Sequence, residues 1–77
     1  MSRIKIAADQ TVGFMLMIEP LGISYQLEPG AFMFFEFSPS RLDEMEIMHW
    51  DGGVSVWMYG DVVVFDQDGK ELDRLFS

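Results

Sequence analysis

The chain lacks cysteine entirely and has only one histidine among its 77 residues. Without cysteine, neither a disulfide nor a thiolate-bound metal can hold the fold together. Zinc and iron sites need three or four protein ligands, normally with two or more His or Cys, so His49 alone is a poor basis for one. We therefore predict no metal and no cofactor, and we expect His49 to be a hydrogen-bonded or partly exposed strand residue.

Basic residues are also scarce, with five Lys and Arg against thirteen Asp and Glu and a net charge of −8. No Lys or Arg occurs between Lys5 and Arg41, or between Arg41 and Lys70. A protein that binds nucleic acid needs a basic surface to displace counterions from phosphates, and anionic membranes attract basic segments as well. We predict that the chain binds neither; its acidity favours solubility and is also compatible with a basic protein partner.

Long hydrophobic runs are missing. No run is longer than the one at residues 14–18, whereas a membrane-spanning helix needs about 20 apolar residues. The first nine residues carry two basic side chains and too few apolar ones for the core of a signal peptide. These features predict a soluble, cytoplasmic protein.

Apolar residues are nevertheless abundant, at 49% of the chain, with seven Phe, seven Met, two Trp and two Tyr. Disordered chains are poor in such residues, so the sequence predicts an ordered protein. The length suits one domain and not two, and a domain this small needs a rich core to be stable. We expect a single small β domain over residues 1–77.

Glycine, proline and aspartate clusters divide the chain into segments of the length usual for strands. The sequence thus predicts an all-β fold of six to seven short antiparallel strands, arranged as a small barrel or a flattened sandwich. Residues 39–44 do not fit a strand and resemble one weakly capped helical turn. The expected strands are 12–19, 23–28, 31–37, 45–50, 54–59 and 62–65, and residues 70–76 form either a last strand or a helical turn.

The stretch from Asp66 to Glu71 looks at first like part of a calcium-binding loop. In the EF-hand pattern a Glu follows the loop glycine by six residues, but the residue six positions after Gly69 is Leu75. The same letters suit a tight turn in which Gly69 takes a positive φ and the aspartates bond nearby backbone groups. We predict the turn.

Several strands are apolar on both faces, notably 12–19, 31–37 and the two strands around Asp51–Gly53, which is a strong hairpin signal. Only residues 23–28 alternate strictly between apolar and polar side chains. One core layer does not need apolar residues on both faces of a strand. In so small a chain the surplus covers a second layer, encloses a ligand or contacts another subunit.

The predicted hairpin concentrates the residue types that dominate binding surfaces. Alternation places Met48 and Trp50 on one face of the first strand, and Trp57 and Tyr59 on one face of the second. Trp, Tyr and Met are frequent in binding hot spots, so these four residues are the candidate binding site. The alternative is that they form the core while Val54, Val56 and Met58 (on the opposite face) point outward.

These observations favour a non-enzymatic interaction module that self-associates or docks on a protein partner through an apolar aromatic face. A second hypothesis is a small barrel that binds an apolar or aromatic small ligand. An enzyme based on His49 and nearby carboxylates is the third, although the sequence holds neither a Gly-x-Ser-x-Gly elbow nor a glycine-rich phosphate loop. The residues expected to line the ligand site in the second case are Phe32, Phe34, Trp50, Trp57 and Tyr59.

The stretch Glu19-Pro20-Leu21-Gly22-Ile23-Ser24-Tyr25-Gln26-Leu27-Glu28-Pro29-Gly30, together with residues 56–61 and 66–72, resembles small bacterial all-β proteins of unassigned function. Residues 25–30 are also similar to the strand and Pro-Gly turn of cupin-like jelly rolls. The metal-binding histidines of cupins have no counterparts in this sequence. The resemblance therefore implies an all-β, cupin-like fold and no activity.

Overall fold

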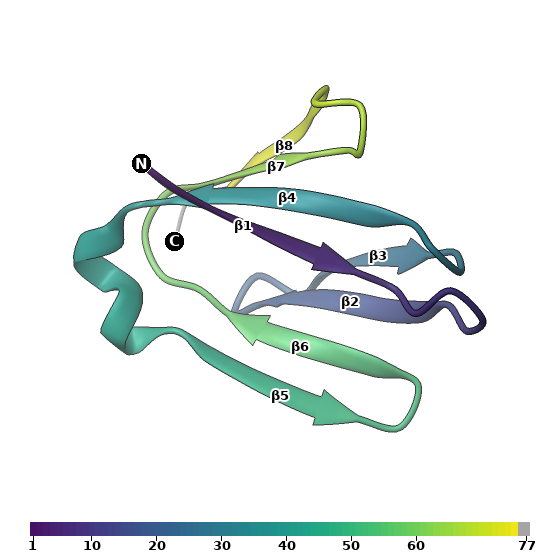
Figure 1. Cartoon of the computed structure of the whole chain (residues 1–77). Coiled ribbons are helices and arrows are strands. Elements are labelled where there is room, and N and C mark those ends of the chain that lie inside the picture. The colour runs from purple at the N-terminus through teal and green to yellow at the C-terminus, as the bar shows by residue number, and fades with distance from the viewer. Residues whose placement is uncertain (76–77) are drawn as a thin grey trace.

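The computed structural model describes residues 1–75, which form a sandwich of two β-sheets (Figure 1). The first sheet has the strand order β1-β4-β7-β8 and the second has the order β3-β2-β6-β5. One short 3₁₀ helix, η1 (Pro39–Glu44), links β4 to β5, and no helix in residues 1–75 is long and apolar enough to cross a membrane. The strands are β1 (Ser2–Ala7), β2 (Phe14–Glu19), β3 (Ile23–Leu27), β4 (Phe32–Phe37), β5 (Glu46–Trp50), β6 (Gly53–Trp57), β7 (Val62–Phe65) and β8 (Glu71–Leu75).

The predicted all-β class is confirmed, and the arrangement is the sandwich and not the closed barrel. Each sheet ends in two edge strands, so neither sheet closes on itself. The segment 39–44 is the helical turn that the sequence suggested, and the tail forms a strand over Glu71–Leu75, while Phe76 lies outside the described residues.

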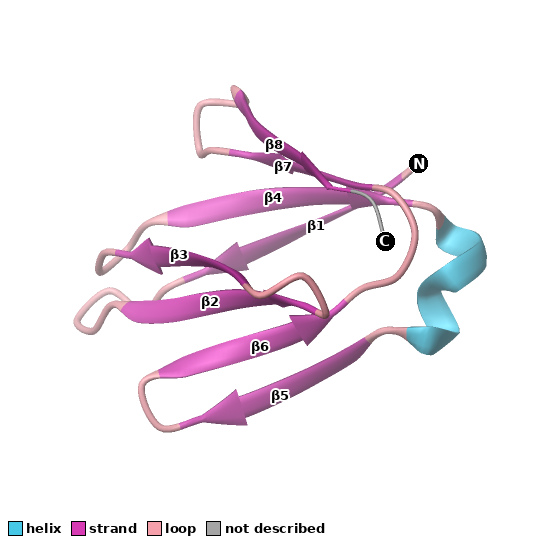
Figure 2. Ribbon diagram, turned by 180° about the vertical axis from the view of Figure 1, so that it is seen from behind, coloured by secondary structure: helices cyan, strands magenta, loops and turns pink. Residues whose placement is uncertain are grey.

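Two features differ from the prediction. β1 is an additional strand, so that residues 1–75 contain eight strands instead of six or seven. The expected sheet was antiparallel throughout, but β2 pairs with β6 in parallel. This pairing arises because the chain leaves the second sheet after β3, builds β4 in the first sheet, and returns through η1 to form β5 and β6 (Figure 2).

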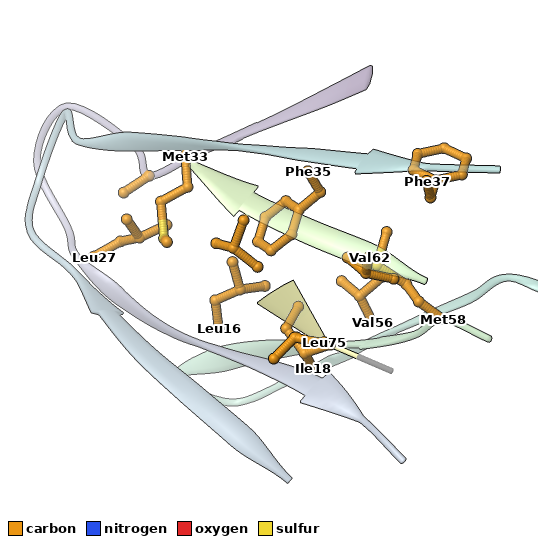
Figure 3. Packing of buried hydrophobic residues seen from close by; sticks show 12 residues of the cluster. Leu16, Ile18, Leu27, Met33, Phe35, Phe37, Val56, Met58, Val62 and Leu75 are labelled. Atoms are coloured by element: carbon orange, nitrogen blue, oxygen red, sulfur yellow. The ribbon is translucent and has the colours of Figure 1, made fainter. Parts of the chain in front are cut away.

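The core lies between the two sheets and is filled by alternate residues of the strands (Figure 3). Phe35 of β4, Leu16 of β2 and Val64 of β7 are completely buried. Burial of each such side chain contributes about 1.5–3 kcal/mol to folding. The other fully buried large side chains are Ile18 and Val56, both from the second sheet.

The outer face of the first sheet accounts for the apolar surplus in residues 31–37. Phe32 and Phe34 point away from the core and meet edge to face, with ring centroids 5.5 Å apart. The basic residues of β1 cover these rings, since Lys5 Nζ lies 4.2 Å from the Phe32 centroid and the Arg3 guanidinium lies 5.1 Å from that of Phe34. Such cation–π contacts let an apolar face stay in water under a charged cover.

The turn between β7 and β8 has the predicted chemistry. Asp66 Oδ1 accepts hydrogen bonds from the backbone N–H groups of Asp68 and Lys70, each at 2.9 Å. Gly69 has a φ of +85°, which a residue with a Cβ rarely adopts. The interpretation of this segment as a turn is confirmed.

One hydrogen bond joins the two sheets on the side where β3 and β8 lie. The Tyr25 hydroxyl donates to Asp73 Oδ2 at 2.5 Å. Burial, together with the hydrogen bond to the Asp73 carboxylate and its charge, raises the pKa of Tyr25 above its ordinary value. The phenol therefore stays protonated in the folded state at pH values where a tyrosine in the unfolded chain ionises.

We predict that Tyr25→Phe lowers the free energy of unfolding by about 1–2 kcal/mol at neutral pH, because the Asp73 carboxylate loses a charge-assisted hydrogen bond. Because the folded-state pKa of Tyr25 lies above the unfolded one, its stabilising contribution is complete below about pH 10 and declines as the pH rises further. Urea unfolding of both proteins at pH 7 and above pH 10 measures this. A difference between the two proteins that does not shrink at high pH would contradict the assignment.

Candidate interaction site

The predicted hairpin exists and is formed by β5 and β6. The strands pair antiparallel, with Trp50 opposite Gly53 and Met48 opposite Ser55. Asp51 and Gly52 make the two-residue turn, in which Gly52 has a φ of +93°. The hairpin joins the second sheet through β6, whose parallel partner is β2, so β5 is an edge strand.

Trp50 is held in place on the outer face of this hairpin. Its indole Nε1 donates to Ser55 Oγ at 3.0 Å. Its ring lies over Gly53, close enough that a Cβ on Gly53 would stand 2.3 Å from Trp50 Cη2. Gly53 is therefore needed to leave room for the ring, and the aromatic surface has a fixed position.

Three of the four predicted binding residues share this outer face. The strand register puts Met48, Trp50 and Trp57 on the side of the second sheet that points away from the core. Met48 is 50% exposed, and both tryptophans are half-buried. We call this set, together with Met15 and Met17 of β2 on the same side, the Met/Trp face.

The alternative in which the tryptophans form the core is wrong. The core residues of this part of the chain are Val56 and Met58, which are 1% and 4% exposed. Successive residues of a strand point to opposite faces, so Trp57 points outward because Val56 points into the core. Because the sandwich has one buried layer, between its sheets, the Met/Trp face lies on the surface. The sequence did not determine this, since both faces of these strands are apolar.

Tyr59, the fourth predicted residue, lies elsewhere. β6 ends at Trp57, so the alternation does not extend to Tyr59. Its ring is 5.7 Å from the guanidinium of Arg41, which is ion-paired with Glu44 in η1. Tyr59 packs at the end of the sandwich that η1 covers and is not part of the Met/Trp face.

The set of residues expected to enclose a small ligand does not form a cavity. Phe32 and Phe34 lie on the outer face of the first sheet, while Trp50 and Trp57 lie on the outer face of the second. The whole thickness of the sandwich separates the two pairs, so this part of the ligand hypothesis is wrong. The reason is that the sandwich has one interior, between its two sheets, so the second apolar face of a strand points outward on one side of the molecule or the other.

A groove that the sequence did not indicate runs along the inner side of the same hairpin. It has a volume of about 460 Å³ and lies between β1, at the edge of the first sheet, and β5, at the edge of the second. We call this the open side of the sandwich, opposite the side closed by Tyr25 and Asp73 (Figure 1). The groove is lined by Ile6, Ala7, Asp9, Val12, Gly13, Phe14, Ile47, His49, Gly52, Gly53, Val54 and Val56.

Ile47 is the most informative residue of the groove. It has the parity of the core residues, because it pairs with Val56, which is 1% exposed, yet Ile47 itself is 57% exposed. His49 has the same parity and is also exposed, as the sequence suggested for a partly exposed histidine. The groove therefore separates the inner face of β5 from β1, and no strand of residues 1–75 packs closely on Ile47.

The chain matches no known protein family, no curated protein and no solved structure in the comparisons. The similarity of residues 25–30 to cupin-like turns remains an expectation from sequence.

The ionisable residues of the groove lining are His49 and Asp9. Asp9 Oδ1 accepts hydrogen bonds from the backbone N–H and the hydroxyl of Thr11, at 2.9 and 2.8 Å. These bonds lower the pKa of Asp9 and fix the carboxylate as part of the loop between β1 and β2. Within residues 1–75, no three His, Asp or Glu side chains gather in a geometry that could hold a metal ion.

The sequence shows that two sets of side chains lie on opposite faces of β5, but it does not indicate the groove. Ile47 and His49 alternate with Met48 and Trp50, so one pair had to face inward and one outward. Which strand would lie opposite β5 depends on the order of strands in two sheets. That order is set by long-range pairing, which a local pattern does not encode.

Proposed function

We propose that the chain is a non-enzymatic protein-interaction module whose contact surface is the open side of the sandwich. The observation that carries this proposal is the exposure of Ile47 on the inner face of an edge strand. An inward-facing apolar side chain without an opposing layer loses the stabilisation that burial supplies, about 25 cal/mol for each Å² of apolar surface. A partner that covers it recovers that free energy.

The chemistry of the groove suits a protein segment in extended conformation. β5 and β1 are both edge strands, so each has one row of backbone N–H and C=O groups that pairs with no strand of residues 1–75. A peptide that adds to such an edge gains backbone hydrogen bonds, and its alternate side chains enter the apolar groove. The adjacent Met/Trp face, with Met48 and Trp50 on the other side of β5, offers a second contact to the same partner.

A small apolar ligand is the second candidate, favoured by the groove volume of about 460 Å³, which falls in the range typical of ligand pockets. Ligand pockets of this kind bury most of the ligand surface. Here one wall is the edge strand β5 with the exposed Ile47, so a small molecule would remain partly in water. A protein segment covers this edge and the groove at once, which is why we favour it.

We expect Ile47→Asp to weaken binding of extended peptides by about tenfold or more, because it places a charge on the apolar wall that the peptide must desolvate. Peptides that bind are first selected from a random library on sparsely immobilised protein, and their affinities for the wild type and for Ile47→Asp are then compared. We expect the wild type to enrich peptides with alternating apolar residues, with affinities then determined by calorimetry.

The matched control is Leu72→Asp, which places the same charge at an exposed leucine of β8, outside the groove lining. It should leave peptide affinity unchanged. The proposal fails if the wild type enriches no peptides of this kind, or if Ile47→Asp and Leu72→Asp have equal effects. Binding of dodecanoate in the groove without peptide binding would favour the small-ligand candidate.

A further inference from the structure

We infer that the partner of the open side is a second copy of this chain, with β1 of each copy placed beside β5 of the other. This inference rests on the proposed function and names its partner. Each sheet of one copy would then continue into a sheet of the other, and the two grooves would close over each other.

The positions of the edge strands permit this arrangement. β1 and β5 border the same groove from opposite sheets. They run in the same direction, as their arrowheads show in both Figure 1 and Figure 2. A two-fold axis along the strands, placed at the open side, therefore sets β1 of each copy next to β5 of the other, in parallel. One self-complementary contact of this kind gives a closed dimer and no open-ended chain of subunits.

The inner faces of the two strands are both apolar and therefore match each other. Ile4 and Ile6 of β1 are partly buried against the core, and Ile6 lines the groove together with Ile47. In the dimer, β5 of the second copy pairs with β1 of the first and so extends the first sheet, which is the layer opposite Ile47 of the first copy. The exposed side chain that marks the open side thus acquires the layer that its own chain does not provide.

The outer sides of the same strands carry opposite charges. β1 presents Lys5, and β5 presents Glu46. Neither takes part in a salt bridge within residues 1–75, whereas Arg3 is paired with Glu36. Pairing β1 with β5 of the other copy brings unlike charges to the same face. The alternative two-fold arrangement pairs β1 with β1 and β5 with β5 in antiparallel orientation, so that it gathers the basic side chains of both copies on one strand pair and the acidic ones on the other and forms no contact between unlike charges.

Sedimentation equilibrium of the full chain tests the dimer. We expect a monomer–dimer equilibrium for the wild type at micromolar concentrations, and a dissociation constant raised at least about tenfold by Ile47→Asp. Leu72→Asp should leave it unchanged, and circular dichroism verifies that each variant is folded. Lys5→Glu should weaken the dimer by about two- to tenfold, and the double variant Lys5→Glu with Glu46→Lys should restore it.

Because the chain has no cysteine, single cysteines report the strand arrangement cleanly. We expect a short bis-maleimide to link Lys5→Cys protein to Glu46→Cys protein in a mixture, and neither variant to itself. Links only within each single variant would overturn the inferred arrangement. A wild type that stays monomeric up to millimolar concentration would overturn the dimer altogether, and if peptide binding persisted, the proposed function would stand without it.

Discussion

Phe35→Ala is expected to lower the free energy of unfolding by about 3–5 kcal/mol. Phe35 is fully buried at the centre of β4, between the two sheets (Figure 3). Its truncation removes apolar surface and leaves a cavity that a close-packed interior refills only in part. A chain of this length has a total stability of roughly 4–12 kcal/mol, so this one change removes a large share of it. Urea denaturation followed by tryptophan fluorescence measures the loss.

The neighbouring phenylalanine provides the matched control. Phe34 lies on the same strand but on the outer face, where it contacts Phe32 and the Arg3 guanidinium. Phe34→Ala removes an edge-to-face pair and a cation–π contact without opening a cavity, so we expect a loss of about 1–2 kcal/mol. If Phe34→Ala destabilised the protein as much as Phe35→Ala, the core would not lie between the sheets as described.

Phe34 and Phe35 also show what a local sequence pattern can predict about this fold and what it cannot. The strand over residues 31–37 was predictable because apolar and aromatic residues run between two turn signals. The choice between Phe34 and Phe35 for the core was not predictable from this run, since both faces of the strand are apolar. The cations that cover the outer rings come from β1, whose register with β4 is a contact between residues about thirty positions apart.

β1 itself was missed for a related reason. Arg3 and Lys5 alternate with Ile4 and Ile6, which is the period of a strand with one face in the core. This run is short and holds few apolar residues, and the pairing with β4 that makes it a strand is a long-range contact. The alternation puts Arg3 and Lys5 on one face of β1, where they lie over the outer phenylalanine rings of β4.

One part of the candidate site, the Met/Trp face, could be predicted from the sequence, and the other part, the groove, could not. The hairpin and the shared face of Met48, Trp50 and Trp57 follow from the turn at Asp51–Gly52 and from alternation. The groove did not follow, because it depends on how closely the strands of the first sheet approach β5, and within residues 1–75 none of them covers Ile47. An unfilled layer is a property of two sheets together, and a single strand's sequence gives no sign of it.

Gly53→Ala is expected to destabilise the protein by about 2–3 kcal/mol, within the range found for overpacked sites. A Cβ at this position would lie 2.3 Å from Trp50 Cη2 and 2.6 Å from the carbonyl oxygen of Met15. The tryptophan ring is held by its hydrogen bond to Ser55, and the Met15 oxygen belongs to the backbone of the adjacent strand. The substitution therefore disturbs both the Met/Trp face and the junction between β2 and β6.

Two measurements follow this change. Urea unfolding gives the loss of stability, and the fluorescence maximum of the folded protein should shift to longer wavelength as the indole of Trp50 turns toward water. The control is Gly52→Ala in the same turn, where the φ of +93° causes backbone strain of about 1–2 kcal/mol but a Cβ meets nothing within 4 Å. Its fluorescence should match the wild type. A Gly53→Ala protein with unchanged stability and emission would mean that Trp50 does not pack over Gly53, and the Met/Trp face would lose the rigid aromatic surface that makes it suited to bind a partner.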